Sequence, residues 1–402
     1  MRWYTPSVPL PRTLRALNRP ALRLFFAGQS VSLLGSWMQP VAQQWLVWRM
    51  TGSTQMLGLL TFCNQLPSLL LGAWAGTVTE TVPRKKVVLA AMAVAALQAT
   101  TLAVLALTNT VQPSHVLLLG IMLGLTYPFE IPARQVMLAE LSGDDLPNVV
   151  AINSTLVTVM RVLGPSLGGL VVAAWGEGWA FAINAVSFVF VIAAVVALPA
   201  PIREAHADVA RVGIGDAVRW AWHQPNIRIL YFQLFALSAI GQAWGTLMPA
   251  WVSRVLGGGP DVLGHLLSFG GAGALLAAVL LLFAEAGQAW RVGAGGVAMA
   301  MGIVTLSIAE SRLLAAPALF LIGLGQVTQS STILTTLQQR SPPQLRGRLL
   351  GLFTMVFVGM VPLGGLAAGL AAEQLGSPMT LRIIGALLAV CSAIYLKTHN
   401  SR

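Results

Sequence analysis

The residues most suggestive of chemistry in this 402-residue chain are charged side chains that interrupt long apolar segments. Arg161 stands inside one such segment, and Glu130 and Arg134 stand one helical turn apart near the end of another. A charge within an apolar span costs about 2.5 kcal/mol or more for arginine, so Arg161 should face the interior of a helical bundle. Two interpretations stay open: a static ion pair between Glu130 and Arg134, or a coupling in which Arg161 pairs with Glu130 in one conformational state.

A stripe of polar side chains follows the first apolar segment. Gln29, Ser32, Ser36, Gln39 and Gln43 recur at spacings of three and four, which places all five on one face of a helix. Lipid would reject such a stripe, so it predicts the lining of a central substrate cavity. The alternative is that several of these groups only form hydrogen bonds between neighbouring helices.

These residues stand on elements whose composition is typical of a membrane protein. The chain is 56% hydrophobic and 9% charged, with a mean hydropathy of +0.75. That is more apolar surface than a soluble core can bury, and stretches of about 20 apolar residues recur throughout. The sequence predicts an all-α membrane protein with about 12 transmembrane helices, over residues 24–48, 56–78, 87–107, 116–138, 149–174, 179–198, 227–252, 263–283, 292–308, 313–337, 349–370 and 381–396.

The positive charges are distributed unevenly between the loops. The chain has 24 Lys and Arg residues and a net charge of +11. With a cytoplasmic N-terminus, 19 of the 24 face the cytoplasm and four face outward, which is the positive-inside pattern. We therefore expect a multi-pass protein of the bacterial cytoplasmic (inner) membrane with both termini cytoplasmic. Nucleic acid is excluded as a partner, since these charges lie in short loops rather than on one basic face.

The chain reads as two related halves. A polar stretch over 201–226 separates an N-terminal half, 1–200, from a C-terminal half, 227–402. Short patterns recur between them: Pro20 and Arg23 return 205 residues later as Pro225 and Arg228, and Leu57-Gly58 returns 206 residues later as Leu263-Gly264. Such offsets indicate two six-helix pseudo-repeats, as in many transporters.

The second half contributes its own polar residues to the predicted cavity. The span over 227–252, which corresponds to the first span, carries Tyr231, Ser238 and Gln242. The span over 313–337 adds Gln326 and Gln329. Amides and aromatic rings with few fixed charges suit a moderately polar or amphipathic small molecule better than a small ion.

Several short motifs resemble the major facilitator superfamily, and within it the enterobactin-exporter or transmembrane-secretion-effector branch. They are Gly35-Ser36-Trp37-Met38, Thr51-Gly52-Ser53, Pro132-Ala133-Arg134-Gln135, Arg161-Val162-Leu163-Gly164-Pro165 and Leu345-Arg346-Gly347-Arg348. The resemblance covers nearly the whole chain. It implies the major facilitator fold and transport by alternating access.

The superfamily signature between spans two and three is only partly kept. The pattern is Gly-x-x-x-Asp-Arg-x-Gly-Arg-Lys, and Gly76, Arg84 and Lys85 match it, with Glu80 in place of the aspartate and Thr81 in place of the first arginine. In the family, this loop is implied to latch the halves in the outward-open state. Because Thr81 replaces that arginine, this chain lacks one of the positive charges of the latch.

A second motif in the fifth span resembles one associated with antiporters of the superfamily. It consists of Gly164, Pro165 and Gly168, and its resemblance favours export. Pro165 removes a backbone donor, while Gly164 and Gly168 at four-residue spacing permit close helix contact. Simple close packing explains the same residues equally well, because Gly72 and Gly76 have the same spacing.

The leading functional prediction is a secondary-active, proton-coupled exporter of a siderophore, antibiotic or other metabolite. No lysine follows a glycine as a phosphate-binding loop requires, and no zinc-ligand spacing occurs, so we expect no cofactor, no metal and no enzyme activity. The expected partners are a small-molecule substrate, protons and the lipid bilayer, with the chain acting as a monomer. The alternatives are uptake or facilitated diffusion and, from another class, a non-transporting membrane sensor.

Overall fold

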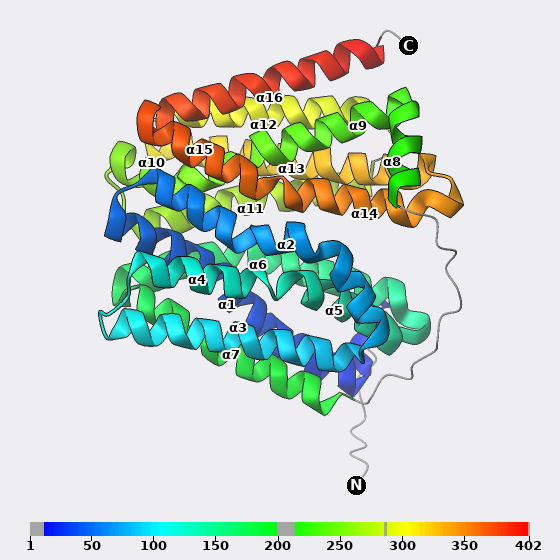
Figure 1. Ribbon diagram of the computed structural model, residues 1–402, viewed down its shortest axis with the longest axis horizontal. Helices are drawn as coiled ribbons and strands as arrows, with labels where there is room; N and C mark the ends of the chain where they lie inside the picture. The colour runs from blue at the N-terminus through cyan, green and yellow to red at the C-terminus, as the bar shows by residue number, and fades with distance from the viewer. Residues whose placement is uncertain (1–11, 199–213, 285–287, 401–402) are drawn as a thin grey trace.

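The computed structural model describes residues 12–198, 214–284 and 288–400, which are helical almost throughout and contain no strand. Long helices run side by side in two bundles, one formed by the first half of the chain and the other by the second (Figure 1). The predicted all-α fold is confirmed.

The first bundle consists of seven helices that make six crossings. They are α1 (Pro20–Thr51), α2 (Thr54–Thr81), α3 (Arg84–Leu107), α4 (Pro113–Gly124) and α5 (Tyr127–Ser142), which share one crossing, α6 (Leu146–Trp175) and α7 (Glu177–Ala197). A short 3-10 helix, Arg12–Asn18, precedes them. Pro20 suits the first turn of α1, where a missing backbone N–H leaves no hydrogen bond unmade.

The second bundle repeats this plan with six further crossings. They are α9 (Pro225–Phe235) and α10 (Trp244–Leu256), joined by π and 3-10 turns, then α11 (Pro260–Leu282), α12 (Trp290–Ile308), α13 (Arg312–Arg340), α14 (Pro343–Gly359) with α15 (Val361–Leu375), and α16 (Ser377–Asn400). The short helix α8 (Ile214–His223) precedes them. It occupies part of the predicted linker over 201–226, of which residues 201–213 lie outside the described residues.

Two glycines end equivalent helices of the bundles in the same way. Gly52 follows α1 with a φ of 60°, and Gly257 follows α10 with a φ of 57°. Glycine adopts this left-handed conformation without the steric penalty of a Cβ atom. The two residues are 205 positions apart, the offset of the sequence repeat.

Nine helical segments of the described chain are long and apolar enough to cross a membrane. The other three crossings are α1, which carries the polar stripe, α2, whose side chains are described only in part, and the segment from α9 to α10, which is interrupted by its π and 3-10 turns. The chain is therefore a multi-pass membrane protein, with its twelve crossings unequal in apolar character.

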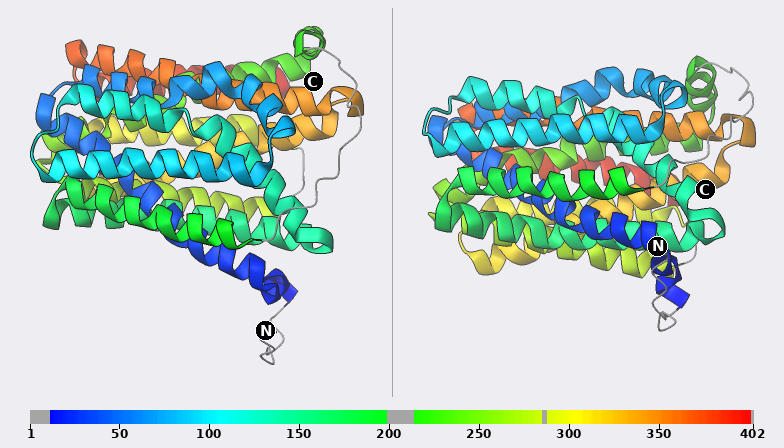
Figure 2. Two further views of the ribbon diagram at one scale, coloured as in Figure 1. Left: turned by 60° about the horizontal axis from the view of Figure 1, so that its bottom comes forward. Right: turned by 90° about the horizontal axis from the view of Figure 1, so that it is seen from below.

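The two ends of the molecule differ in what they hold. One end, here called the termini end, holds the start of α1, the helix α8 and the end of α16 (Figure 2). The other, here called the opposite end, holds the turns at Gly52, Gly176, Gly257 and Gly376.

The bundles contact each other mainly through two pairs of helices, α6 with α11 and α2 with α15. Glycines permit this approach: a Cβ added to Gly169 would lie 3.0 Å from Cα of Gly264, and a Cβ added to Gly58 would lie 2.9 Å from the carbonyl oxygen of Gly365. Close backbone contact of this kind is typical of helix packing within membranes. The two contacts use Gly58 and Gly264, which are equivalent in the sequence repeat.

These contacts gather at the opposite end. There Glu373 accepts a hydrogen bond from the backbone N–H of Thr54, at 2.7 Å, and Thr61 and Thr246 share a hydrogen bond of 3.2 Å. Each of these bonds joins one bundle to the other and ties α2 to the C-terminal half.

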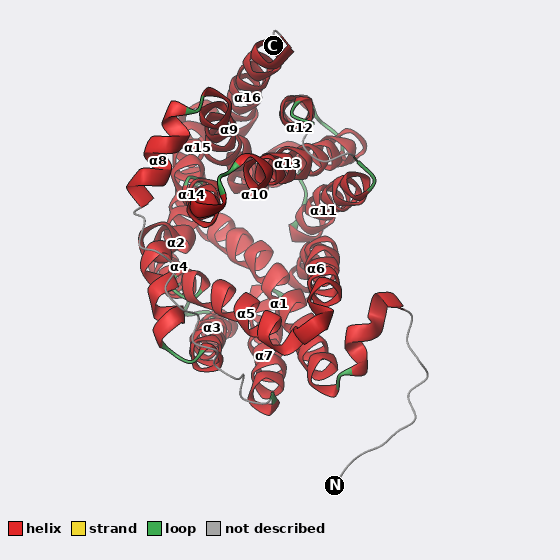
Figure 3. Ribbon diagram, turned by 90° about the vertical axis from the view of Figure 1, so that its right-hand side faces the viewer, coloured by secondary structure: helices red, strands yellow, loops and turns green. Residues whose placement is uncertain are grey.

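Toward the termini end, the facing surfaces become exposed. On the face of α6 that turns to α11, Pro165 and Gly169 are buried, whereas Ala151 and Ser154, nearer the start of the helix, are exposed. Figure 3 views the two bundles from this end, with α6 and α11 on one side and α2 and α14 on the other. The bundles are thus sealed at the opposite end and diverge toward the termini end.

Candidate functional site

The polar stripe on α1 is mostly buried in this conformation. Gln29, Ser32, Gln39 and Gln43 are 1%, 7%, 2% and 2% exposed. Ser36 is the only one of the five that is partly accessible. It borders an accessible face of α1 formed by Trp37, Pro40 and Gln44, which is turned about 90° from the stripe.

Within the first bundle, the buried amides hydrogen-bond to three neighbouring helices. Gln39 donates to the side-chain oxygen of Gln98 on α3 at 3.0 Å and accepts from Asn184 on α7 at 2.5 Å. Gln29 donates to Asn153 on α6 at 3.1 Å. The stripe therefore forms a polar core of the first bundle here, and substrate contact by these residues stays a prediction.

One consequence concerns the stability of this polar core. We expect Gln39→Leu to lower the free energy of unfolding by about 1–3 kcal/mol, because the buried side-chain oxygen of Gln98 and the side-chain nitrogen of Asn184 each lose their hydrogen bond to Gln39. Thermal unfolding of the purified protein measures the effect, with Ser36→Ala as the partly exposed control on the same helix. An unchanged melting temperature for Gln39→Leu would show that the network does not stabilise the bundle.

The predicted cavity residues of the second half do not lie together in one site. Gln326 on α13 donates to Gln242 at 3.0 Å, and both side chains are partly accessible. Gln329 is buried and donates to Gln233 at 3.2 Å. Ser238 donates to the carbonyl oxygen of Phe357 at 3.0 Å. Of these residues, the structure brings together only Gln242 and Gln326 as a partly accessible pair.

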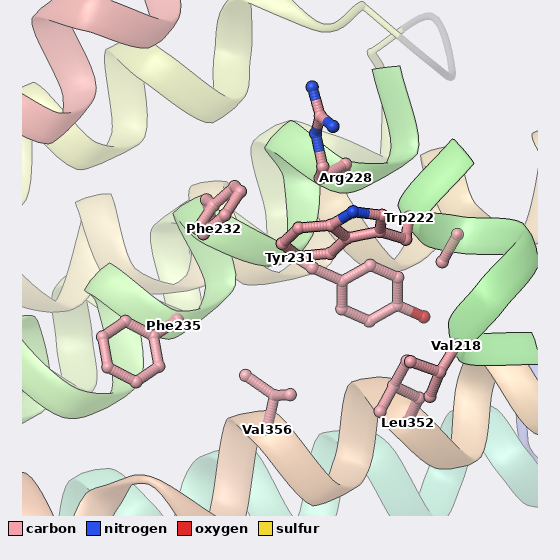
Figure 4. Close-up of a pocket in the computed structure, with 9 residues that line it drawn as sticks. Val218, Trp222, Arg228, Tyr231, Phe232, Phe235, Leu352 and Val356 are labelled. Carbon is pink, nitrogen blue, oxygen red and sulfur yellow. The ribbon is translucent and has the colours of Figure 1, made fainter. Parts of the chain in front are cut away.

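Tyr231 lies elsewhere, in a groove of about 330 Å³ at the termini end, between α8, α9 and α14 (Figure 4). The groove is lined by apolar and aromatic side chains, among them Trp222, Phe232 and Phe235, and by Arg228. The Tyr231 hydroxyl donates to the carbonyl oxygen of Leu349 at 2.7 Å. Its predicted contact with substrate stays a prediction.

The charged residues of the first bundle pair locally. Arg134 lies 2.9 Å from Glu130, across one turn of α5. Arg161 on α6 instead places its guanidinium 5.0 Å from the ring centre of Trp37, a cation–π contact. In this conformation the structure thus shows the Glu130–Arg134 pair, and a switch of Glu130 to Arg161 stays a prediction.

The glycines of the antiporter-like motif face α1. A Cβ on Gly164 would collide with the side chain of Trp37, and a Cβ on Gly168 would lie 2.9 Å from Cα of Met38. The carbonyl of Pro165 faces Gly264 of α11. The motif therefore packs α6 tightly against both α1 and α11, and a role in coupling stays a prediction.

The signature loop between α2 and α3 is anchored to its own bundle. Arg84 pairs with Glu140 on α5, and Lys85 donates to the carbonyl oxygens of Val196 and Leu198, at 2.9 and 2.6 Å. Gly76 and Glu80 stand in the last turns of α2, in a run that lies outside the residues whose side chains are described. The predicted latch between the halves therefore stays a prediction.

Sequence reasoning missed the partners of the stripe. Gln98, Asn153 and Asn184 are each hydrogen-bonded to it, and Glu140 pairs with Arg84. A signal was present for the amides, because each interrupts an apolar span of α3, α6 or α7.

Comparisons with known proteins agree with this architecture. The model of the transmembrane secretion effector family matches residues 12–401. The staphyloferrin A transporter of Staphylococcus aureus is 23% identical, with 90% of this chain and 92% of that protein covered. The multidrug efflux pump Tap of Mycolicibacterium fortuitum is 26% identical, with 89% and 90% covered. The enterobactin exporter of Salmonella choleraesuis is 26% identical, with 92% of each covered.

Solved structures share the fold at low sequence identity. A bacterial homologue of the human lysosomal transporter Spinster, in an inward-facing and unoccupied conformation, superposes with a TM-score of 0.76 at 13% identity, covering 94% of this chain and 96% of that one. The nucleoside transporter NupG gives a TM-score of 0.75 at 13% identity, with 94% and 99% covered. The family match over nearly the whole chain, together with two bundles packed through α6–α11 and α2–α15, shows that this protein belongs to the transmembrane secretion effector family of major facilitator transporters.

Proposed function

We propose that the chain is a secondary-active exporter that moves small molecules by alternating access. The observation that carries this proposal is the one-sided seal: the bundles are joined by glycine contacts at the opposite end and diverge at the termini end. A pathway closed on one side and accessible from the other is one of the two states that rocking halves require.

We further propose that the termini end is cytoplasmic, in a bacterial inner membrane, so that this state is open to the inside. The charges support this orientation. Arg84, Lys85, Arg291 and Arg346 are among the many basic residues at the termini end, whereas few stand at the opposite end. An inward-open state is the one that loads cytoplasmic cargo for export.

Export rather than uptake is supported by the relatives. Two of the three are described as an efflux pump and an exporter, and each matches about nine-tenths of this chain. The substrate class that we propose is an amphipathic metabolite, such as a siderophore or an antibiotic. We also propose that the protein acts as a monomer.

Protons are the proposed coupling ion, with Glu130 as the proposed carrier. Its carboxylate is mostly enclosed on α5 and is held by Arg134 at 2.9 Å. Protonation would release that pair and free the arginine, so a proton and a conformational change would share one group.

The experiment uses cells that express the chain and a panel of dyes, antibiotics and siderophores, with and without a protonophore. We expect lower accumulation of at least one compound, and we expect the protonophore to abolish the difference. Everted vesicles then test the coupling directly, because an imposed pH gradient should drive substrate flux. A flux that ignores the gradient would refute proton coupling, and accumulation raised by the chain would instead support uptake.

A further inference from the structure

Arg161 points into the space between the two bundles. On α6, Gly164 and Gly168 face α1, while Pro165 and Gly169 face α11. At 100° per residue, Arg161 lies between these two directions on the helix surface. Its side chain therefore leaves α6 toward the junction of α1 and α11, where the first bundle meets the second.

The position of Arg161 along α6 is the level at which the seal ends. Val162, the next residue, is still in contact with α11, because its carbonyl oxygen accepts a hydrogen bond from Ser268 at 2.6 Å. About two to three turns nearer the termini end, Ser154 and Ala151 are exposed on the same side of α6. Arg161 thus stands at the closed end of the surface that is accessible from the termini end.

The described carboxylates of the first bundle do not neutralise Arg161, because each is paired with another arginine. The pairs are Glu130 with Arg134, Glu140 with Arg84, Glu177 with Arg49, and Asp145 with Arg15 and Arg19. Within the described part of the chain, the guanidinium of Arg161 instead lies over the neutral ring of Trp37, 5.0 Å from the ring centre. A cation–π contact compensates only part of the cost of removing a guanidinium from water.

A partly buried guanidinium that has no carboxylate partner in the protein can bind an anionic group of a ligand. Its planar fork can donate two parallel hydrogen bonds to one carboxylate, and the pairing gains strength where water is scarce. The neighbouring indole of Trp37 supplies an apolar, aromatic surface for the rest of the ligand, with Ser36 beside it partly accessible.

We propose that Arg161 and Trp37 form a subsite for the carboxylate of an anionic, amphipathic substrate. This assignment rests on the proposed transport function and narrows its substrate class to organic anions. The guanidinium binds the carboxylate, while Trp37 packs against the adjacent apolar part of the ligand.

The test is equilibrium binding to the purified protein in detergent, without any gradient. The probes are 5-carboxyfluorescein, which is anionic, and rhodamine 6G, a cationic xanthene of similar size whose carboxyl is esterified; fluorescence anisotropy reports both. We expect the wild-type protein to bind 5-carboxyfluorescein more tightly. Arg161→Gln should weaken that binding by about thirtyfold or more, which corresponds to ~2 kcal/mol, and should leave rhodamine 6G unchanged.

Two matched variants separate the subsite from general damage. Arg161→Lys keeps the charge but not the planar fork, and should retain part of the preference for the anion. Arg382→Gln removes an arginine near the start of α16, at the opposite end of the molecule, and should have no effect. Equal loss of both dyes in Arg161→Gln, no change in either, or no preference for the anion in the wild type would overturn the assignment. Because binding is measured without flux, an absence of transport would count against the exporter and not against the subsite.

Discussion

Replacing Gly264 with tryptophan is expected to abolish transport while leaving the protein folded. A side chain at this position would meet the carbonyl oxygen of Pro165, and its Cβ would lie 3.0 Å from Cα of Gly169. Both obstacles are backbone of α6 and cannot rotate away, so the α6–α11 contact has to open. Overpacking costs about 1–3 kcal/mol for a few added atoms, and an indole adds far more, so the sealed state should fall about a hundredfold or more in population.

The substitution should destabilise the sealed state rather than the fold, because Gly264 lies at a contact between the bundles and not at one within a bundle. Flux in reconstituted vesicles measures the loss. Reaction of Thr61→Cys with a membrane-impermeant maleimide, in a chain without Cys63 and Cys391, measures whether the seal has opened, since Thr61 faces Thr246 across the junction. We expect reaction at least about tenfold faster in the Gly264→Trp protein.

The control is Gly72→Trp, because a Cβ at Gly72 meets no atom within 4 Å. That variant should transport normally and keep the slow reaction at Thr61→Cys. Normal flux in Gly264→Trp would mean that closure at the opposite end is not part of the transport cycle, and it would contradict the proposed alternating access.

The helices, and the correspondence between helices of the two halves, could be predicted from the sequence because they depend on local and repeated features. Apolar length predicts a crossing wherever it occurs, and the 205-residue offset places Gly52 and Gly257 at equivalent helix ends. The offset of 206 residues likewise relates Gly58 to Gly264, and each of these glycines stands at one of the two contacts between the bundles.

The facing of the polar stripe could not be predicted in the same way. A period of three and four shows that Gln29, Gln39 and Gln43 share a face, and it holds equally for a cavity wall and for a buried helix contact. What decides between these is the partner, and Gln98 and Asn184 belong to helices distant in sequence.

The charged residues illustrate a similar limit. The spacing of Glu130 and Arg134 permits their ion pair, since residues four apart lie on one side of a helix. The contact of Arg161 with Trp37 joins α6 to α1, and no spacing along the chain encodes it. Local pairs follow from sequence, whereas pairs between helices need the packing.

The largest loss of stability is expected for Gly323→Val, within the second bundle. Gly323 on α13 packs against α11 so closely that a Cβ would overlap the carbonyl oxygen of Gly270 and lie 3.1 Å from the backbone nitrogen of Ala274. The helices α11 and α13 form one of the most extensive contacts of the molecule, and the obstacle is again backbone. We expect the free energy of unfolding to fall by about 3 kcal/mol or more, with little monodisperse protein recovered.

Gly351→Val provides the comparison, because it adds the same atoms to α14 at a site where a Cβ meets nothing within 4 Å. Size-exclusion profiles and thermal unfolding in detergent measure both variants side by side. If Gly323→Val were as stable as Gly351→Val, the α11–α13 contact would have to be looser than described. A loss confined to Gly323→Val shows that glycine has two separate uses here: within a bundle it permits a permanent contact, and between bundles, as at Gly264, it permits one that must form and break.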